Sequence, residues 1–416
     1  MRTSSVQLAT RQISSTYRTH AQQVKGYHEV SYLEKGEPLN VLQLSTHDDA
    51  KTSPFSMDWS ALPSTSWVCV EMKAVPWNPA DMNSVQGTYA SPYDSTEAAE
   101  ASAVLSQSHF SPKRTVAGSS GIGVVSEMTA SKDNRFAVGD WVTVAQPGLG
   151  TMRSSVWAPA SSWIKISRGS ELFEKHGDGI STIFQLGGTA LRMLRDFQVL
   201  RPGDCVIQNA GNSGVGWMAS QLAAAHDVSM VSLVRRGTRS AESFNTLVDH
   251  LKTKGRNTRV IAEEDLCDQA SLQDFRRELQ LVSHRPRVLA LNAVGGDSAG
   301  KLVKLLDRHG TLVTYGGMSM KPLSISAGHL IFQDIKVVGY WNSRWMLQHS
   351  LSQQQAMTDE LVDLVLSKEI VGPPVRVFPL SDFQQGIKND LQQGKETIRN
   401  KVVFDVAISG HQKSIV

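Results

Sequence analysis

A glycine-spaced turn between two apolar runs is the feature of this sequence with the clearest chemistry. The segment Val-Ile-Gln-Asn at 206–209 runs into Ala-Gly-Asn-Ser-Gly-Val-Gly at 210–216. In such a turn, glycines let backbone N–H groups approach a diphosphate at the positive end of the following helix. Taken alone, the glycines are equally compatible with a tight structural turn.

The elements that must position this turn favour the first interpretation. Segment 215–225 is alanine-rich and helical in its pattern, and segment 228–234 is an apolar run typical of a buried strand. Together with the strand before the turn, they predict a βαβ unit. This is the setting in which a glycine-rich turn binds a dinucleotide.

Two arginines end the second strand of that unit. A site for NAD usually has an acidic residue here, which accepts hydrogen bonds from the ribose hydroxyls. Arg235 and Arg236 instead carry guanidinium groups that suit a 2′-phosphate. The sequence therefore predicts NADPH as the cofactor, with a pair of solvated arginines at a strand end as the alternative.

The length and charge of the chain limit the possible classes of protein. A chain of 416 residues exceeds what one hydrophobic core usually holds, so two domains are expected. The net charge of +3 is too small to predict nucleic acid or a membrane surface as a partner. No apolar run reaches the roughly 18 to 20 residues that cross a bilayer, so we expect no membrane span.

Cysteine and histidine usage predicts metal-free chemistry in a reducing compartment. Cys69, Cys205 and Cys267 are too few and too scattered for a disulfide framework. They also lack the Cys-x-x-Cys spacing of a zinc site, and the 12 histidines show no ligand spacing.

The first 28 residues are basic, rich in Ser and Thr, and contain no Asp or Glu. This composition is typical of a mitochondrial transit peptide rather than of a secretory signal, which needs a continuous apolar region. We therefore assign 1–28 as a transit peptide and expect the protein in the mitochondrial matrix. The alternative is an unstructured tail without a targeting role.

The pattern of apolar residues changes near residue 187. Before it, apolar stretches are short, alternating and bounded by turns, which predicts an antiparallel β domain. After it, a helix at 189–197 is followed by strands that alternate with helices, as in a doubly wound parallel sheet. The predicted strands are 66–75, 121–127, 140–145, 205–209, 228–234, 259–262, 288–293, 311–315 and 336–338.

The last part of the chain has a looser pattern. It contains predicted helices near 356–367 and 382–393 and a strand at 401–406, and we expect it to return to the first domain. The Ser-, Ala- and Glu-rich segment 91–113 predicts a long surface loop or a short helix. A lid and a tolerated insertion are equally compatible with that segment.

Several motifs occur in a fixed order after residue 65. They are Trp-Asn-Pro-Ala-Asp-Met-Asn at 77–83, Val-Gln-Gly-Thr-Tyr at 85–89, Gly-Leu-Gly-Thr at 148–151, Arg-Pro-Gly-Asp at 201–204, Gln-Asn-Ala-Gly-Asn-Ser-Gly-Val-Gly at 208–216, Leu-Asn-Ala-Val-Gly-Gly at 291–296 and Val-Thr-Tyr-Gly-Gly-Met at 313–318. In this order the chain resembles the medium-chain dehydrogenases/reductases, and more narrowly the mitochondrial 2-enoyl thioester reductases. Because the matches are collinear over most of the chain, they are more specific than any single turn motif.

The resemblance implies an α/β fold with two domains and no zinc. A GroES-like antiparallel β-barrel is expected to carry catalysis, and a Rossmann domain with a doubly wound parallel sheet is expected to bind NADPH. The implied boundaries are 29–186 for the catalytic domain, 187–345 for the Rossmann domain and 346–416 for a segment that returns to the catalytic domain.

The resemblance also implies an activity, which is the NADPH-dependent reduction of trans-2-enoyl thioesters in mitochondrial fatty acid synthesis. The substrate would be an enoyl-CoA or an enoyl-acyl-carrier-protein, and the enzyme a homodimer. Hydride delivery to the β-carbon places negative charge on the thioester oxygen, which needs a hydrogen-bond donor. The family's catalytic tyrosine falls on Tyr89, and a phenol with an unperturbed pKa near about 10 stays protonated at neutral pH. Tyr93 is a competitor that lacks the preceding Gln-Gly pair.

Further positions carry over to the cofactor. The nucleotide loop, the 2′-phosphate arginine with its neighbour, the nicotinamide-side loop, an aromatic segment and a late lysine are all implied to contact NADPH. These residues are Asn212, Ser213, Gly214, Val215, Arg235, Arg236, Tyr315, Gly316, Gly317, Met318, Tyr340, Trp341 and Lys401.

The chain departs from the family pattern at three motifs. Leu-Gly-Gly-Thr-Ala at 186–190 replaces Asn-Pro-x-Thr-Ala, Gly-Ser-Ser-Gly at 118–121 replaces Gly-Asn-Glu-Gly, and Arg-Arg-Gly at 235–237 replaces Arg-Asp-Arg. The first change removes or replaces an amide contact to the cofactor. The second removes a carboxylate, and the third moves the second cation.

Two other functions remain open from the sequence. A zinc-free quinone or enone reductase would share the fold but need no tyrosine donor. A non-catalytic dinucleotide-binding partner protein would need neither substrate nor tyrosine. In the same way, Trp341 and Trp345 either line an acyl channel or pack between the domains.

Overall fold

The computed structural model describes residues 27–47, 66–90, 103, 105–108, 113–129, 135–254, 258–282, 285–393 and 398–406. The predicted transit peptide and most of segment 91–113 therefore lie outside the described residues. The chain divides into two compact units, and each is described by itself. The first unit comprises Met1–Lys165, Val377–Lys388 and Val402–Val416, and the second comprises Ile166–Arg376 and Asn389–Lys401.

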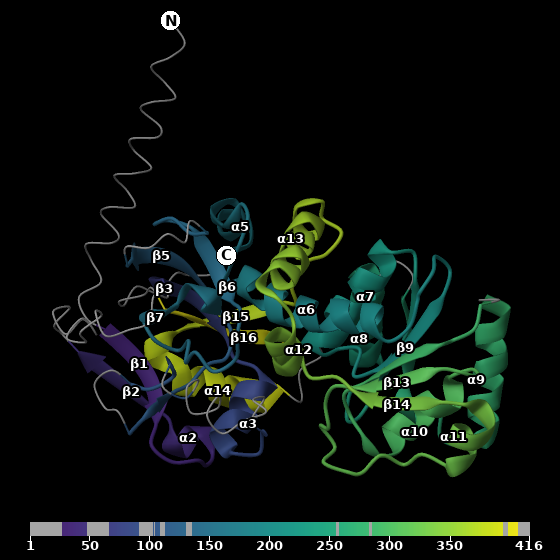
Figure 1. Ribbon diagram of the computed structural model, residues 1–416. Coiled ribbons are helices and arrows are strands. Elements are labelled where there is room, and N and C mark those ends of the chain that lie inside the picture. The colour runs from purple at the N-terminus through teal and green to yellow at the C-terminus, as the bar shows by residue number, and fades with distance from the viewer. Residues whose placement is uncertain are drawn as a thin grey trace, which may run out of the picture. The chain divides into compact units, whose positions relative to one another are not determined.

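The first unit is built on antiparallel β-sheets, as the sequence predicted. A seven-stranded sheet has the order β15-β16-β3-β5-β6-β8 with β7 paired to β3, and a three-stranded sheet has the order β2-β1-β4. The last strand, β16, pairs with β3 in this sheet, and β15 lies on the other side of β16 (Figure 1). The strands are β1 (Tyr27–Tyr32), β2 (Gln43–His47), β3 (Trp67–Pro76), β4 (Thr115–Val116), β5 (Ile122–Met128), β6 (Trp141–Val144), β7 (Ser155–Pro159), β8 (Trp163–Lys165), β15 (Val375–Pro379) and β16 (Lys401–Asp405).

Apolar residues of these strands form the core of the first unit. Val68 and Val70 of β3 are fully buried together with Trp77, which follows the strand, and Trp163 of β8. Phe404 of β16 belongs to the same cluster. Burying each such side chain contributes roughly 1.5 to 3 kcal/mol, so the last strand is held in the first unit by its own apolar residues.

The second unit contains a six-stranded parallel sheet in the order β11-β10-β9-β12-β13-β14. Numbered from its first strand, this order is 3-2-1-4-5-6, which is the strand order of dinucleotide-binding folds. Each predicted strand is present, with ends that agree to within about two residues. The strands are β9 (Cys205–Asn209), β10 (Ser229–Val234), β11 (Thr258–Ala262), β12 (Leu289–Asn292), β13 (Thr311–Thr314) and β14 (Lys336–Gly339).

Helices cover both faces of this sheet (Figure 1). α7 packs on β9 and β10, α8 packs on β11, and α10 packs on β9 and β12. The helices of the second unit are α5 (Gly169–His176), α6 (Ser181–Asp196), α7 (Gly214–Ala225), α8 (Ala241–Lys254), α9 (Gln269–Val282), α10 (Gly296–Leu305), α11 (Ala327–Gln333), α12 (Asn342–Gln348) and α13 (Leu351–Leu366). Within the described ranges, none of the helices combines the length and the apolar character needed to cross a membrane.

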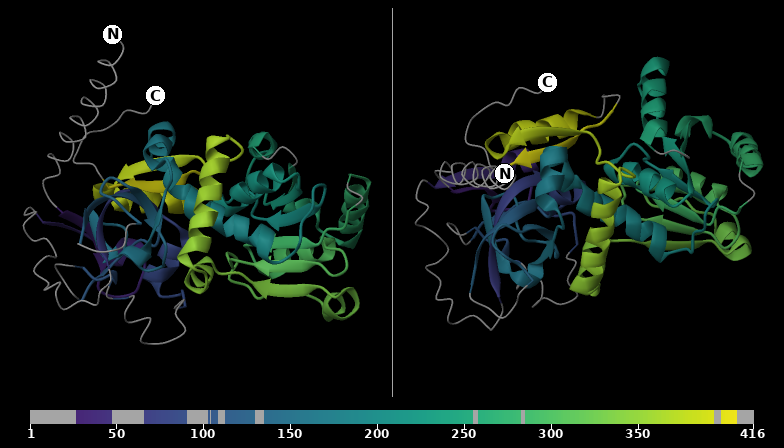
Figure 2. Two further views of the ribbon diagram at one scale, coloured as in Figure 1. Left: turned by 45° about the horizontal axis from the view of Figure 1, so that its top comes forward. Right: turned by 90° about the horizontal axis from the view of Figure 1, so that it is seen from above.

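Helix α6 starts at Ser181, eight residues before the predicted start at 189. The predicted helix did not include Gly187 and Gly188, but both are buried residues of α6. A Cβ at Gly187 would lie 3.0 Å from Leu361 of α13, and a Cβ at Gly188 would lie 3.1 Å from Met357. The glycines therefore allow α13 to pack closely on α6. Figure 2 shows the two helices side by side.

The division into units differs from the boundaries expected from the sequence. The first unit ends at Lys165 rather than at residue 186, because α6 packs on α7 and α13 of the second unit. Residues 346–376 also belong to the second unit. Helix α13 begins at Leu351, earlier than the predicted 356, because the side chain of Ser350 accepts a hydrogen bond from the Gln353 amide and caps it.

Candidate functional site

The glycine turn lies at the carboxyl end of β9, where the strand order of the second unit changes direction. Ala210 has a φ of 50°, which is uncommon for a residue with a Cβ. The amide of Ser213 donates to the Ala210 carbonyl at 2.8 Å, and the Ser213 hydroxyl accepts from the Gly216 amide at 3.1 Å. The turn is therefore fixed by its own hydrogen bonds before α7 begins.

Two of the glycines are required by the closeness of neighbouring atoms. A Cβ at Gly216 would lie 2.6 Å from the Ala210 carbonyl oxygen, and a Cβ at Gly211 would lie 2.5 Å from the Cβ of Ser232. Both distances are shorter than the contacts that Cβ atoms make in real proteins. Larger residues would open the turn and move it off the sheet.

The start of α7 presents donors that suit a diphosphate. Ser213 serves as the N-cap, and the amides of Gly214 and Val215 have no acceptor within the helix because they belong to its first turn. The positive end of the helix dipole lies at the same place. The predicted nucleotide loop, with Asn212 at its head, thus has the geometry of an anion-binding turn.

A buried network of amide side chains holds the strand ends beneath this turn. Asn209 at the end of β9 donates to Asn292 at 2.7 Å and to Ser298 at 3.0 Å. Asn292 donates in turn to Thr314 at 3.1 Å, and the Asn209 side-chain oxygen accepts from the Ala293 amide at 2.7 Å. Both asparagines are fully buried. Because the network is paired throughout, it fixes the carboxyl ends of β9, β12 and β13 relative to one another.

The nicotinamide-side loop begins directly after β13. Burial raises the pKa of the Tyr315 hydroxyl to about 12, and the Ser213 side chain lies close enough to oppose that shift. Gly316 lies where a Cβ would come within 2.9 Å of the Ala293 carbonyl oxygen, and the Met318 amide donates to the same oxygen at 3.0 Å. The structure therefore brings the two predicted loops, 212–215 and 315–318, to one edge of the sheet.

The two arginines after β10 differ in their surroundings. The Arg236 guanidinium donates to both carboxylate oxygens of Asp265, at 2.8 and 3.0 Å, and lies over the ring of Phe244 at 5.3 Å. Arg235 is exposed. From the sequence, both arginines were predicted to contact the cofactor. The ion pair of Arg236 with Asp265 was not predicted.

The aromatic segment after β14 is part of the packing of the second unit. Tyr340 is buried, its hydroxyl donates to Asn342 at 3.0 Å, and its ring meets the Phe197 ring edge-on at 6.0 Å. Burial raises the pKa of this hydroxyl well above its ordinary value. Tyr340 thus has protein partners for both its ring and its hydroxyl.

The neighbouring tryptophans have cationic or aromatic partners. Arg344 lies over the Trp341 ring at 5.4 Å. The buried Trp345 stacks on His349 at 4.2 Å and carries Arg192 over its ring at 4.9 Å. Trp345 therefore packs within the second unit itself. Lys401, the last predicted cofactor residue, is the first residue of β16.

Tyr89 lies in the first unit, just after helix α3 (Pro79–Gln86). Asn78 and Asp81 form a capping box at the start of this helix, and Gly87 ends it in a left-handed conformation with a φ of 77°. Glycine adopts that conformation without strain. The Gln-Gly pair before the tyrosine thus forms the C-terminal end of α3, where the chain changes direction. Tyr89, two residues later, is 37% exposed.

The serines at 119 and 120 support this helix, a role that the sequence did not indicate. The Ser119 hydroxyl donates to Asp81 at 2.6 Å, and the Asn78 side chain donates to the Ser120 hydroxyl at 3.0 Å. At the other end of α3, the Lys35 ammonium donates to the Ser84 carbonyl at 2.8 Å. The departure from Gly-Asn-Glu-Gly therefore places two hydroxyls where they hold the start of α3.

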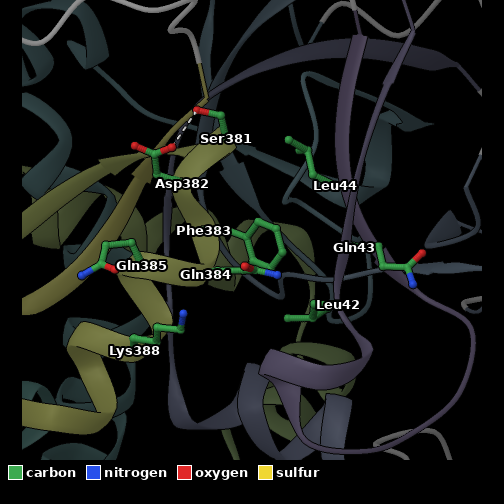
Figure 3. Close-up of a pocket in the computed structure, with 9 residues that line it drawn as sticks. All are labelled: Leu42, Gln43, Leu44, Ser381, Asp382, Phe383, Gln384, Gln385 and Lys388. Atoms are coloured by element: carbon green, nitrogen blue, oxygen red, sulfur yellow. Dashed lines mark hydrogen bonds between the residues drawn. The ribbon is translucent and has the colours of Figure 1, made fainter.

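A separate cavity of about 630 Å³ lies in the first unit, between β2 and α14 (Phe383–Gln392) (Figure 3). It contains none of the predicted site residues. Among the described residues there is also no cluster of three or more His, Cys, Asp or Glu side chains that could bind a metal ion. The cavity is lined by Leu42, Gln43, Leu44, Ser381, Asp382, Phe383, Gln384, Gln385 and Lys388.

Comparison with known proteins agrees with this geometry, although no family profile matches the sequence. The mitochondrial enoyl-acyl-carrier-protein reductase of Xenopus tropicalis is 33% identical over 86% of this chain and 90% of its own length. The solved Etr1p/NADP/crotonyl-CoA complex superposes with a TM-score of 0.74 at 24% identity, covering 92% of this chain and 100% of that chain. The mitochondrial 2-enoyl thioester reductase Etr1p/Etr2p heterodimer from Candida tropicalis superposes with a TM-score of 0.72 at 24% identity over the same shares. The chain belongs to the family of the mitochondrial enoyl-acyl-carrier-protein reductases.

Proposed function

We propose that this protein reduces trans-2-enoyl thioesters of CoA or acyl carrier protein to saturated acyl thioesters with NADPH, in mitochondrial fatty acid synthesis. The observation that carries the proposal is the glycine turn at the switch point of a 3-2-1-4-5-6 sheet, in a chain of this family. The named activity of the Xenopus tropicalis relative and the NADP and crotonyl-CoA of the Etr1p complex support it.

The residues of the second unit fit a bound dinucleotide phosphate. The amides of Gly214 and Val215 receive the diphosphate, Arg235 receives the 2′-phosphate, and the Tyr315–Met318 loop receives the nicotinamide end. When bound, NADPH supplies the hydride for the β-carbon of the substrate. Tyr340, Trp341 and Lys401 remain proposed cofactor contacts.

Tyr89 is the proposed catalytic residue of the first unit. Its hydroxyl donates a hydrogen bond to the thioester oxygen, where negative charge develops as the β-carbon is reduced. Such a donor matters to a thioester reductase and not to a quinone reductase. The rate of NADPH consumption with crotonyl-CoA and with a quinone therefore tests the function, and quinone turnover without crotonyl-CoA turnover would overturn it.

The second unit also has the features of a dimer interface. β14 is the edge strand of the parallel sheet, so its outer backbone groups are unpaired within it. The adjacent α11 exposes Ile331 and Phe332 at 70% and 72%, and β14 exposes Val337. We propose a homodimer in which two copies pair through this edge. Light scattering of the purified protein tests it, and a monomer at micromolar concentration would contradict it.

The protein is proposed to act in the mitochondrial matrix, with residues 1–28 as its transit peptide. The support for the location is that its relatives are named as mitochondrial enzymes. N-terminal sequencing of the protein recovered from mitochondria tests the transit peptide, and recovery of an intact Met1 there would contradict cleavage.

A further inference from the structure

The loop between β10 and α8 is held by a carboxylate from the neighbouring strand end. One side-chain oxygen of Glu264 accepts a hydrogen bond of 2.9 Å from the Arg236 amide, and the other accepts a hydrogen bond of 3.1 Å from the Gly237 amide. Glu264 lies in the 3-10 turn η5 (Glu263–Asp265), directly after β11. Both hydrogen bonds go to residues that immediately follow Arg235.

The next residue of the same turn holds the Arg236 side chain. Asp265 accepts two hydrogen bonds from its guanidinium, and the ring of Phe244 lies beneath it. Arg236 is thus fixed both through its backbone and through its side chain. A guanidinium that already donates from one of its nitrogens to both oxygens of a carboxylate has fewer donors left for a phosphate.

Arg235 is the arginine that this arrangement leaves available. Its side chain makes no hydrogen bond or ion pair with the residues that the structure describes, and its carbonyl accepts from Arg239 at 3.3 Å. We propose that Glu264 and Asp265 are positioning residues for nucleotide selection, which fix the β10–α8 loop so that Arg235 receives the 2′-phosphate while Arg236 serves as the anchor of the loop.

The charge of Glu264 allows a positioning role to be distinguished from a purely electrostatic effect on phosphate binding. Burial opposes ionisation of Glu264, but the hydrogen bonds from the Arg236 and Gly237 amides outweigh it and hold the pKa below its ordinary value. The carboxylate is therefore charged at neutral pH. By Coulomb repulsion alone, its removal would strengthen the binding of a phosphate in this region. A positioning role predicts the opposite.

The inference rests on the proposed use of NADPH, so the test begins with the unaltered protein. Calorimetry with 2′,5′-ADP and with 5′-ADP measures the contribution of the 2′-phosphate without any turnover. The same two titrations are then made on Glu264→Ala, Glu264→Gln and Asp265→Asn. Glu242→Gln is the matched control, because this exposed glutamate in the first turn of α8 carries the same charge and binds neither amide.

We expect Glu264→Ala to weaken 2′,5′-ADP binding by about 5-fold or more, with 5′-ADP changed by less than about 2-fold. Glu264→Gln keeps one acceptor oxygen and should fall between. Asp265→Asn should weaken 2′,5′-ADP binding in the same direction, and Glu242→Gln should leave both affinities unchanged. In activity assays, the KM for NADPH should rise in Glu264→Ala while kcat is kept.

The outcomes separate the two claims. If the unaltered protein binds both nucleotides equally, the preference for NADPH is wrong and the inference falls with it. If it prefers 2′,5′-ADP but Glu264→Ala binds that nucleotide equally well or more tightly, only the positioning role is overturned. Equal weakening for both nucleotides would also overturn it. Thermal melting of each variant shows that it is folded, and Glu264→Gln gives the answer if the alanine variant unfolds.

Discussion

The side chain of Asn209 donates a hydrogen bond of 2.7 Å to the side chain of Asn292, which joins the carboxyl ends of β9 and β12. These two strands flank the switch point of the parallel sheet. A dinucleotide binds above such a point because the loops that follow the two strands turn to opposite sides there. The pair thus ties together the two loops between which the cofactor is proposed to lie.

Replacement of Asn209 by alanine should therefore lower both stability and cofactor affinity. It leaves the Ala293 amide and the Asn292 oxygen with fewer partners in a buried place, which we expect to lower the free energy of unfolding by about 3 kcal/mol. Urea unfolding and NADPH titration measure the two effects. Asn245→Ala, on the exposed face of α8, is the control. Equal stability of the two variants would show that the network does not hold the strand ends.

Replacement of Tyr89 by phenylalanine should remove the proposed donor to the thioester oxygen. We expect kcat/KM for crotonyl-CoA to fall by about 100-fold or more, with the dissociation constant of NADPH unchanged. A large loss of turnover with unchanged NADPH binding would identify Tyr89 as the hydrogen-bond donor. Tyr93→Phe is the matched control, since this tyrosine lacks the Gln-Gly step. A Tyr89→Phe variant with more than half of the original kcat/KM would refute the assignment.

Replacement of Arg235 by glutamine should change the choice of nucleotide. Loss of a charge-assisted contact to the 2′-phosphate should raise the KM for NADPH by about 10-fold, while the KM for NADH stays near its original value. Arg277→Gln, which breaks only an exposed pair with Asp274, serves as the comparison. If both nucleotides lose affinity equally, Arg235 does not read the phosphate.

The ion pair network around Asp307 should make stability depend on pH in the acid range. Burial opposes ionisation of Asp307, but the hydrogen bond from the Arg287 amide, the charge of Arg287 and the hydrogen bonds from the Arg287 and Arg276 side chains outweigh it and hold its pKa below the ordinary value. Because the folded-state pKa is the lower one, the stabilisation is complete above about pH 4 and is lost as the pH falls through the folded-state value.

Asp307→Asn should thus lower the free energy of unfolding at pH 7 by about 2 kcal/mol, less than for a fully buried pair. Its stability should also depend less on pH below pH 4 than that of the original protein. Urea unfolding between pH 3 and pH 7 measures both quantities. Asp274→Asn, whose carboxylate is exposed, provides the reference. Parallel pH curves for the original protein and Asp307→Asn would contradict the assignment.

The central strands of the second unit, β9, β10 and β12, were predictable because their residues are buried on both faces. Segment 205–209 begins with the apolar residues Cys-Val-Ile and has turn residues on either side, and the structure has a fully buried strand at Cys205–Asn209. In the first unit, alternation and turns predicted β3, β5 and β6, but not the short strands β4, β7 and β8. In both cases the signal lies within a few neighbouring residues.

The features that the sequence did not reveal depend on contacts between distant segments. The partners of Asn209 lie 83 and 89 residues away in the sequence. Glu264, which accepts a hydrogen bond from the Arg236 amide, lies 28 residues after Arg236. The early start of α6 was missed for a related reason. A Gly-Gly pair breaks a helix by propensity, and only the side chains of α13 show why glycines are needed there.

One turn of α6 has neighbours on two sides. A Cβ at Gly214 would lie 2.8 Å from a methyl group of Leu186, and Gly187, the next residue of α6, lies against Leu361 of α13. The nucleotide turn and α13 are therefore separated by little more than the thickness of one helix backbone. A methyl group added at position 187 would meet the ends of the Leu361 and Met218 side chains at 3.0 and 3.3 Å, so both side chains would have to shift. Glycine at this position thus lets α7 and α13 approach α6 from two directions without such a shift.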